Sequence, residues 1–312
     1  MIRGGAIGDF ILTLPVLSAL RQHDPTAQLE LLGYPHIAQL ALVGGLVDAV
    51  RPIEARDLAA AFAPDVLLSP HLAAYFSRFD LILSYLYDPG EVFQENVARV
   101  SGARFLAGPH RPDPDGHRHA SEVMLDPLAQ LGVVTPDPIP RLRLRAPSLP
   151  APDPRTAPAA LAPGMMSRRL AVHPGSGSER KNWPEPCWAA LLARLAAEGD
   201  WSLLLLGGEA EGERLERLAV RWPAGRLEVA RSLPLVQLAQ RLSSCQFFIG
   251  HDSGITHLAA ALGLPGLVLW GESPLEVWRP RHQAMECLLA GTRLSQLEVA
   301  EVWTALAPRL FR

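Results

Sequence analysis

Apolar positions in the first half of the chain follow two alternating patterns. Short apolar runs bounded by Asp, Pro or Gly are typical of buried parallel strands, whereas a 3.6-residue apolar period predicts helices between them. The same alternation begins again after residue 168. The expected strands are 28–32, 47–53, 66–69, 81–84, 170–173, 201–206, 227–230, 247–250 and 266–269. The expected helices are 9–23, 35–43, 91–100, 120–131, 184–198, 209–222, 235–242 and 255–262.

A proline-rich stretch separates the two alternating halves. Nine prolines lie between Pro136 and Pro163, around a strand-like run at 141–145, and this composition predicts a semi-rigid linker. Strand–helix alternation on both sides of such a linker is typical of two Rossmann-like, doubly wound α/β domains that face a cleft. We expect domains at 1–150 and 169–312, joined by a linker at 151–168. The amphipathic stretch 295–312 either packs back on the first domain or forms a terminal helix on its own domain.

Composition narrows the class of protein. Hydrophobic residues make up 48% of the chain and charged residues 20%, so it can bury a sizeable core. The formal charge of −3 argues against a general nucleic-acid binder, because such proteins carry a basic excess. The three cysteines have no C-x-x-C spacing, which disfavours a disulfide framework and a structural zinc site and fits a reducing, cytoplasmic compartment.

Signals for export and for membrane spans are weak. Asp9 directly precedes the apolar run Phe10–Leu20, and no small-x-small cleavage site follows that run. The longest later apolar stretch, 258–270, is shorter than the roughly 20 residues that a spanning helix needs. Any membrane contact is therefore expected to be peripheral.

Three loops carry candidate chemistry, because ligands of doubly wound sheets bind outside the carboxyl ends of the strands. The first loop, Gly4–Asp9, has only part of the G-x-G-x-x-G fingerprint, since Arg3 stands at the first glycine position. No acid closes the next strand either, so a nicotinamide or flavin site is disfavoured. What remains is Asp9 at a helix start, either a catalytic acid or an ordinary first-turn acid favoured by the helix dipole.

The second loop contains the single lysine of the chain. Twenty-eight of the 29 basic residues are arginine, and Lys181 follows a stretch rich in glycine and hydroxyl groups. Backbone N–H groups and hydroxyls beside a cation form a phosphate site, which makes Ser176, Gly177 and Lys181 candidates for binding. The alternative is an ordinary polar loop with solvated charges. Because ammonium and guanidinium groups are not interchangeable where geometry matters, the single lysine favours the binding interpretation.

The third loop joins the buried strand 247–250 to a helix that ends at Gly263. Gly254 lets a pyrophosphate approach free N–H groups at the helix start, and Ser253 adds a hydroxyl. Asp252 is expected to hydrogen-bond a sugar hydroxyl or to hold the loop. His257 reaches a phosphate or is structural. A hydrolase triad is disfavoured because no G-x-S-x-G elbow is present.

Two further features bear on the site. Glu209 follows the strand 201–206 at its carboxyl end, where a ribose or base would lie, and is a weaker binding candidate. His110, His117 and His119 lie in a proline- and glycine-rich loop with no common metal spacing. No metal site is therefore expected.

Three segments together resemble a known enzyme family. They are GAIGDFILTLPVLSALR at 5–21, HPGSGSERKNWPEPCWAALL at 173–192 and GHDSGITHLAAALGLPGLVLWGES at 250–273. In this order and spacing they resemble glycosyltransferase family 9, the bacterial ADP-heptose:lipopolysaccharide heptosyltransferases. The resemblance spans Met1 to about Arg281. It differs at the start, because the family usually opens with a longer first strand.

The resemblance implies a GT-B fold, with the acceptor in the N-terminal domain and the nucleotide-sugar donor in the C-terminal domain. It implies an inverting transfer without metal or cofactor, most simply of heptose from ADP-heptose to a lipid-linked lipopolysaccharide glycan at the inner face of the cytoplasmic membrane. It also places the catalytic aspartate in the Gly-Asp motif, so Asp9 is the expected base. Lys181 is expected to neutralise the diphosphate as charge builds on the leaving group.

Two other classes stay open on the residues alone. A Rossmann oxidoreductase or epimerase is disfavoured by the incomplete glycine fingerprint and by the missing strand-ending acid. A catalytically inactive protein that binds nucleotide sugars would retain the same donor loops.

Overall fold

A computed structural model of the chain describes residues 1–64, 66–113, 115–144, 168–209, 211–291 and 293–311. The expected linker at 151–168 lies outside these residues except for its last position. The chain divides into two compact units. The first unit comprises Met1–Leu142 and Pro274–Arg279, and the second comprises Arg143–Ser273 and Pro280–Arg312.

The described part of the first unit is built on a five-stranded parallel sheet with the order β3-β2-β1-β4-β5. Its strands are β1 (Ile2–Arg3), β2 (Glu30–Gly33), β3 (Ala49–Pro52), β4 (Leu81–Ser84) and β5 (Arg104–Ala107). Its helices are α1 (Ile7–Ile11), α2 (Leu14–His23), α3 (Pro35–Val43), α4 (Pro70–Phe76), α5 (Val92–Ala98), α6 (Ala120–Leu125) and α11 (Leu275–Trp278), with 3-10 turns at Arg56–Phe62 and Asp126–Leu131.

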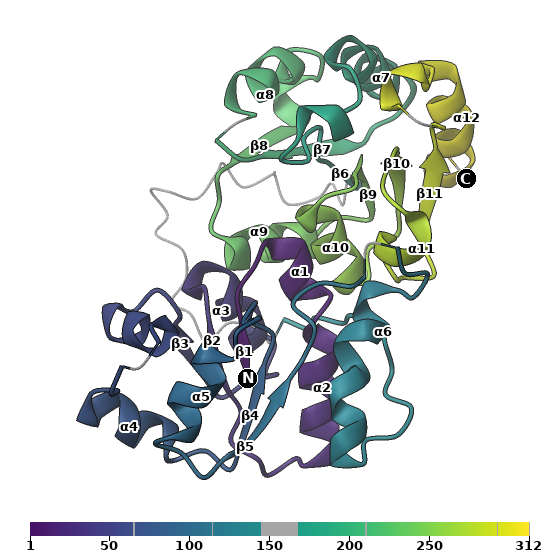
Figure 1. The fold of residues 1–312 in the computed structure, drawn as a ribbon. Coiled ribbons are helices and arrows are strands. Elements are labelled where there is room, and N and C mark those ends of the chain that lie inside the picture. Colours follow the sequence, from purple (N-terminus) through teal and green to yellow (C-terminus); the bar gives the residue numbers. More distant parts are fainter. Residues whose placement is uncertain (65, 114, 145–167, 210, 292, 312) are drawn as a thin grey trace. The chain divides into compact units, whose positions relative to one another are not determined.

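Helices cover both faces of this sheet (Figure 1). On one face, α2 and α6 pack on β4 and β5 through residues such as Val16, Met124 and Leu83. On the other face, α4 and α5 pack on β1, β2 and β4, where Phe76 and Ile82 are buried. Neighbouring residues of β4 point to opposite faces, as the two-residue period of a strand requires. Because helices cover both faces of the sheet, the sequence of β4 is a continuous apolar run.

The second unit contains a six-stranded parallel sheet with the order β11-β10-β9-β6-β7-β8 among the described residues. Its strands are β6 (Arg169–Val172), β7 (Ser202–Gly207), β8 (Leu227–Arg231), β9 (Phe247–His251), β10 (Gly266–Trp270) and β11 (Met285–Leu289). Its helices are α7 (Glu185–Glu198), α8 (Gly212–Ala219), α9 (Leu235–Leu242), α10 (Gly254–Ala261) and α12 (Val299–Leu310), with 3-10 turns at Glu179–Lys181, Ala224–Arg226 and Leu294–Gln296.

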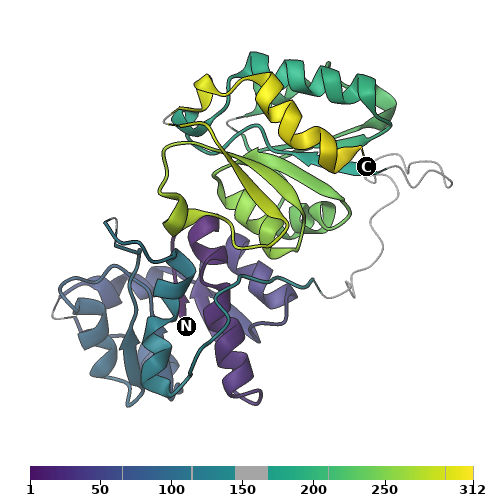
Figure 2. The ribbon, with the colours of Figure 1, turned by 90° about the vertical axis from the view of Figure 1, so that its right-hand side faces the viewer.

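One core of the second unit lies between the sheet and helices α7, α8 and α12. Figure 2 shows α7 and α12 on the same side of this sheet and α9 and α10 on the other. Alternate strand residues, among them Leu203, Leu205, Phe247 and Ile249, face the α7 side. The apolar face of α12 contributes Trp303 and its neighbours to this core, so the terminal helix of the sequence prediction makes described contacts with its own unit.

The predicted helix 9–23 is wrong, because the structure breaks it into α1 and α2. Thr13 precedes the second helix and Pro15 stands at its second position. A proline inside one continuous helix would lack the N–H group for its hydrogen bond and would clash with the carbonyl of residue 11. The chain therefore turns and starts a new helix.

The predicted strand at 66–69 is also wrong. These residues pair with no strand; Ser69 instead caps α4 by accepting a hydrogen bond from the Leu72 N–H at 3.3 Å. The neighbouring Leu67 is 88% exposed, which is incompatible with an inner strand buried on both faces. Residues 141–144 form no strand either. The helix expected at 209–222 is shorter, Gly212–Ala219.

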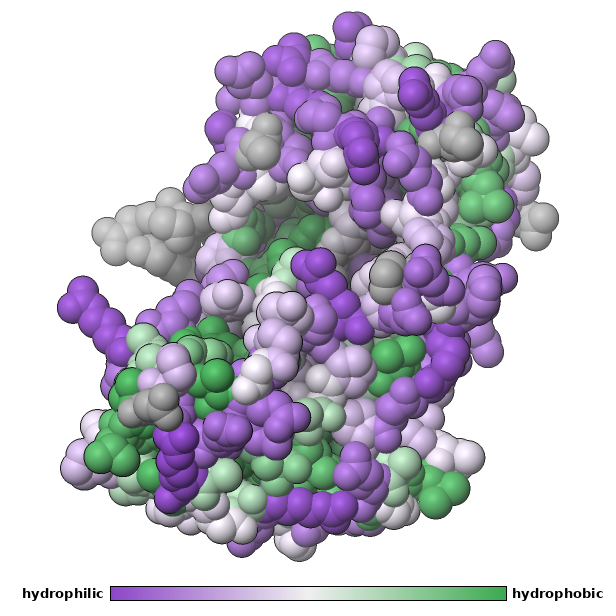
Figure 3. Space-filling model, viewed as in Figure 1, coloured by the Kyte–Doolittle hydropathy of each residue, from purple (hydrophilic) through white to green (hydrophobic). Residues whose placement is uncertain are grey.

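Hydrophilic side chains cover most of the face of each unit drawn in Figure 3, with apolar residues in smaller groups. Among the described helices, none has both the length and the apolar character needed to cross a membrane. All three cysteines, Cys187, Cys245 and Cys287, are free thiols.

Candidate donor site and candidate base

The strand order of each sheet places the predicted loops at a switch point. In the first sheet the direction of the chain order reverses between β1 and β4, and in the second between β6 and β9. Ligands of open α/β sheets bind outside the carboxyl ends of strands at such points. The loops 173–183 and 252–254 follow β6 and β9, and Gly4–Asp9 follows β1. The predicted site residues therefore lie at the edges where the fold favours binding.

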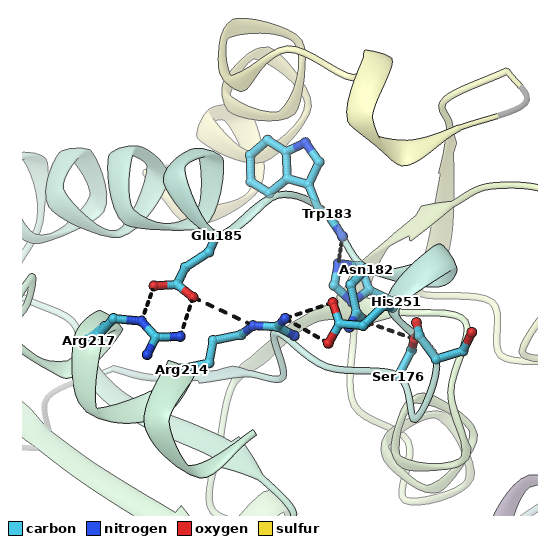
Figure 4. A network of polar contacts seen from close by, with 9 residues as sticks. Ser176, Asn182, Trp183, Glu185, Arg214, Arg217 and His251 are labelled. Carbon is cyan, nitrogen blue, oxygen red and sulfur yellow. Dashed lines mark hydrogen bonds and ion pairs between the residues drawn. The ribbon is translucent and has the colours of Figure 1, made fainter. Parts of the chain in front are cut away.

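The loop 173–183 is folded upon itself at the carboxyl end of β6 (Figure 4). The Ser176 hydroxyl lies 2.7 Å from Asn182 Oδ1 and 2.9 Å from the Ser178 carbonyl. Gly177 is exposed and has φ +74°, a conformation that strains any residue with a β-carbon. The glycine and the hydroxyl thus shape the loop before any ligand binds.

Lys181 reaches across the switch point to the loop after β9. Its Nζ lies 2.5 Å from Asp252 Oδ2, between residues 71 positions apart in sequence. The Ser273 hydroxyl donates to the same carboxylate oxygen at 2.5 Å. The Lys181 side chain is 40% exposed and that of Asp252 is 12% exposed, so the ammonium group is the more accessible partner. An entering diphosphate would therefore meet the lysine first.

Helix α10 begins beside this ion pair. The Ser253 hydroxyl caps it, accepting the Thr256 N–H at 3.3 Å, and it is buried against His173 Nδ1, also at 3.3 Å. The N–H groups of Gly254 and Ile255 have no acceptor within the helix, because the first turn never does. They offer an anion site strengthened by the helix dipole. His257 is buried inside α10.

Two buried histidines, His173 and His251, lie at the carboxyl ends of β6 and β9. Burial lowers the pKa of His173 to about 4 and that of His251 to about 3, so both imidazoles are neutral near pH 7. His251 Nε2 accepts the backbone N–H of Trp183 at 3.0 Å. His251 was not among the predicted site residues, because its place directly after the apolar run 247–250 marks a strand end and does not indicate its partner.

Glu211 is the acid that the structure places at the carboxyl end of β7. Its side chain is buried and its Oε2 accepts the Gly208 N–H at 2.9 Å. A β-carbon at Gly175 would lie 2.5 Å from Glu211 Oε1, so the carboxylate adjoins the start of the loop 173–183. Glu209, the candidate from the sequence, is exposed. The missed signal was position, because Glu211 directly precedes α8, where acids are favoured.

An arginine network ties the same loop to α8 (Figure 4). Arg214 donates two hydrogen bonds to the Glu179 carboxylate, both at 2.8 Å. On the next turn, Arg217 forms a bidentate pair with Glu185 at 2.7 and 2.9 Å. Glu179 is 80% exposed while Arg214 is 17% exposed. Exposed pairs of this kind add little stability, so we assign the network a role in loop position only.

Asp9 lies in the first turn of α1 in the first unit. Its Oδ2 accepts the Ala6 N–H at 3.1 Å, and its side chain is half-buried. Gly5 has φ +98°, and a β-carbon added there would lie 3.1 Å from that oxygen. Below it, the buried Arg3 donates to the carbonyls of His110 and Asp9 at 2.9 and 3.3 Å. Among the described residues, the hydrogen bond to this carboxylate is made by Oδ2.

Two other features lie elsewhere. A pocket of about 870 Å³ opens at the amino ends of the first sheet, lined by Met1, Leu29 and Leu81 among others, and contains none of the predicted site residues. Within the described ranges, no group of three or more His, Cys, Asp or Glu side chains is arranged to hold a metal ion. The expected absence of a metal stays a prediction.

Two parallel sheets of Rossmann-like order, each with helices on both faces, define a GT-B fold of the glycosyltransferase class. The model of glycosyltransferase family 9 (heptosyltransferase) matches residues 103–302, well over half of the chain. The chain belongs to this family of enzymes, as its motifs predicted.

Similar proteins include lipopolysaccharide heptosyltransferase 1 of Escherichia coli O18:K1:H7, which is 34% identical over 118 residues, or 38% of this chain and 36% of that protein. The segments matched in the first three curated relatives span 25% to 36% of their lengths. A family 9 structure from Veillonella parvula gives a TM-score of 0.75 at 18% identity, covering 98% and 95% of the two chains. An E. coli heptosyltransferase solved with ADP gives 0.74 at 20% identity, covering 98% of each.

Proposed function

We propose that this protein transfers heptose from ADP-heptose to an inner-core lipopolysaccharide glycan or a related lipid-linked acceptor. The family and the heptosyltransferase activity named for its relatives support the reaction class. The observation that carries the proposal is the Lys181–Asp252 pair beside the free N–H groups of α10. It supplies one cation, one carboxylate and a helix start, which are the groups that a nucleotide diphosphate and its sugar need.

In the proposed donor complex, Lys181 exchanges Asp252 for the diphosphate. The released Asp252 carboxylate then accepts a hydroxyl hydrogen of the donor sugar, and Glu211 faces the nucleoside from the end of β7. Lys181 and the first N–H groups of α10 stabilise the negative charge that develops on the leaving diphosphate. No metal or cofactor is part of this proposal.

Asp9 is the proposed base in the first unit. Its carboxylate takes the proton of the acceptor hydroxyl while that oxygen bonds to the anomeric carbon. The bond from the anomeric carbon to the phosphate oxygen breaks on the opposite side, and ADP leaves with both electrons of that bond. The configuration at the anomeric carbon is thereby inverted. The proposed place of the reaction is the cytoplasm, with the acceptor presented at the inner membrane face.

Product analysis by mass spectrometry tests the reaction. The purified protein is incubated with lipopolysaccharide core fragments and, in parallel, ADP-heptose, a UDP-sugar and a GDP-sugar. We expect a product heavier by one heptose with ADP-heptose alone. Transfer from a different nucleotide sugar would replace the donor, and the absence of transfer from all of them would overturn the proposed reaction.

A thermal-shift panel of ADP, UDP, GDP and NAD tests the class of site independently of turnover. A ligand that binds the folded state raises the melting temperature according to its affinity. We expect stabilisation by ADP. Stabilisation by NAD alone would favour the oxidoreductase or epimerase class, and ADP binding without transfer would favour an inactive nucleotide-sugar binder.

A further inference from the structure

His251 is a buried polar group that the proposed reaction does not use. It ends β9, has 0% of its surface exposed, and packs edge-on against the Trp188 ring at 5.3 Å. A polar ring at such a depth is costly unless it is hydrogen-bonded. Its described hydrogen bond is from the backbone N–H of Trp183 to Nε2, at 3.0 Å. That N–H stands between a 3-10 turn and α7, where no helix carbonyl accepts it.

The imidazole contacts the end of the donor loop. Trp183 closes the loop 173–183 and is fixed a second time, by its indole Nε1, to the Leu297 carbonyl at 2.8 Å. The bond to His251 is drawn in Figure 4. The ring and the Leu297 carbonyl therefore fix the end of the segment that holds Ser176, Gly177 and Lys181.

Two neighbouring residues at the end of β9, His251 and Asp252, each bind one residue of the donor loop. His251 holds Trp183, and Asp252 holds Lys181 two positions earlier. The contact between Asp252 and Lys181 must break when Lys181 binds the diphosphate, whereas the contact between His251 and Trp183 can persist. The bond between His251 and Trp183 would then keep Lys181 in a constant position relative to the start of α10. Displacement of a charged group by about 1 Å can cost on the order of a hundredfold in rate.

We propose that His251 is a positioning residue that fixes the donor loop to the end of β9 and thereby sets the place of Lys181 at the diphosphate. This proposal rests on the proposed function for its effect on turnover, but not for its effect on the loop. The side chain acts through a backbone N–H, so an acceptor at the position of Nε2 is what the site requires.

The test compares two substitutions of His251. His251→Gln can present an amide oxygen near the place of Nε2, whereas His251→Leu fills the space without an acceptor. We expect the Leu variant to raise the dissociation constant of ADP, measured by calorimetry, about tenfold, and the Gln variant to recover most of that loss. The KM for ADP-heptose should rise and kcat should fall together, because the displaced Lys181 serves both donor binding and the leaving diphosphate.

Hydrogen exchange gives a readout without turnover. Peptides covering 174–183 should exchange faster in His251→Leu than in the wild type, with His251→Gln between them, while peptides of β7 stay unchanged. His119 offers a matched control, since it is also buried and bonds the Arg279 carbonyl at 2.8 Å, within the first unit. His119→Leu should leave ADP affinity and exchange of the donor loop unchanged.

The outcomes separate the two proposals. Faster loop exchange with weaker ADP binding, in a protein that transfers no heptose, supports the positioning role and overturns the proposed reaction. Unchanged loop exchange and ADP affinity in a folded His251→Leu overturn the positioning role, whatever the activity. If His251→Leu does not fold, His251→Gln decides: loop exchange and an ADP dissociation constant that both rise moderately above the wild-type values support the positioning role, and wild-type values of both overturn it. Weaker binding without faster loop exchange in that variant overturns it.

Discussion

At the scale of single residues, the proposed chemistry depends on Lys181, the one lysine in the sequence. Lys181 donates to Asp252 in the structure, and in the proposed reaction it donates to the leaving diphosphate. An ammonium group can rotate three donors between these partners, while a guanidinium presents a planar fork of fixed geometry. A lysine at position 181 can therefore bind both partners in turn, whereas an arginine there cannot match the geometry of both.

Lys181→Ala is expected to lower kcat/KM for ADP-heptose by on the order of a hundredfold, as loss of one stabilising donor at a developing charge does. Lys181→Arg should recover only part of this loss, because a planar guanidinium cannot turn its donors between Asp252 and the diphosphate as an ammonium group can. Steady-state kinetics measure both effects. Arg180→Ala is the control, since Arg180 is a neighbouring cation, 81% exposed and 3.8 Å from Glu272. Full activity of the Arg variant would contradict the special role of the lysine.

Stability should fall with acid because of the buried histidines. The pKa values of His173 and His251, about 4 and about 3, lie below the unfolded value near 6.5. Between pH 6.5 and about 4 these two imidazoles are protonated in the unfolded chain but stay neutral in the folded chain. The free energy of unfolding therefore decreases as pH falls. The slope is at most about 1.4 kcal/mol per pH unit for each histidine.

Denaturant unfolding at pH 7, 6 and 5 measures this slope. We expect His251→Gln to flatten it relative to the wild type. His23→Gln, which removes an exposed histidine at the end of α2, should change it less. Equal slopes in the wild type and in His251→Gln would show that His251 is not excluded from protonation in the folded state.

At the scale of elements, the site is built where two strands and two helix starts converge. Parallel strands place their carboxyl ends at one edge of the sheet, and each following helix points its first N–H groups to that edge. Gly175 allows Glu211, at the start of α8, to pack directly against the loop after β6. A side chain at position 175 would separate these two elements.

Gly175→Ala is expected to displace the Glu211 carboxylate, because the new β-carbon would lie 2.5 Å from Glu211 Oε1. The nucleoside contact proposed for Glu211 should weaken, raising the dissociation constant of ADP several-fold with a smaller change in stability. Calorimetry and thermal melting measure the two effects. Gly225→Ala is the control, because a β-carbon there meets no atom within 4 Å. Unchanged ADP affinity in Gly175→Ala would remove Glu211 from the donor site.

At the scale of the whole molecule, the proposed chemistry is divided between the two units. The donor groups Lys181, Asp252 and Glu211 belong to the second unit, and Asp9 belongs to the first. Each unit has its own sheet and its own core among the described residues. Binding and catalysis should therefore be separable by mutation.

Asp9→Asn is expected to lower kcat by a few hundredfold or more, as loss of a general base does, while leaving the dissociation constant of ADP nearly unchanged. The amide keeps the shape of the side chain and its acceptor for the Ala6 N–H, so the fold should be preserved. Kinetics and calorimetry on the same preparation measure the two quantities. Glu95→Gln, an exposed acid on α5, serves as the control. Near-normal turnover of Asp9→Asn would exclude Asp9 as the base.

The sequence by itself determined the class of fold and the loops. The limits of α3, α9 and β4 agree with the periodicity, and the three loops predicted from glycine, hydroxyl and charge patterns all follow strands at their carboxyl ends. This was predictable because the periods of 2 and 3.6 residues record which face of an element is buried. Capping and turn residues act within a few positions of themselves, so they too can be read locally.

Only the tertiary structure decided which distant groups meet. Nothing local indicates that Lys181 contacts Asp252, that Trp183 bonds to His251, or that Glu211 rather than Glu209 adjoins Gly175. The strands β5 and β11, each at one edge of its sheet among the described residues, were also missed. Strand order in a parallel sheet is set by crossover connections and by packing of both faces at once, and a periodic pattern carries no information about either.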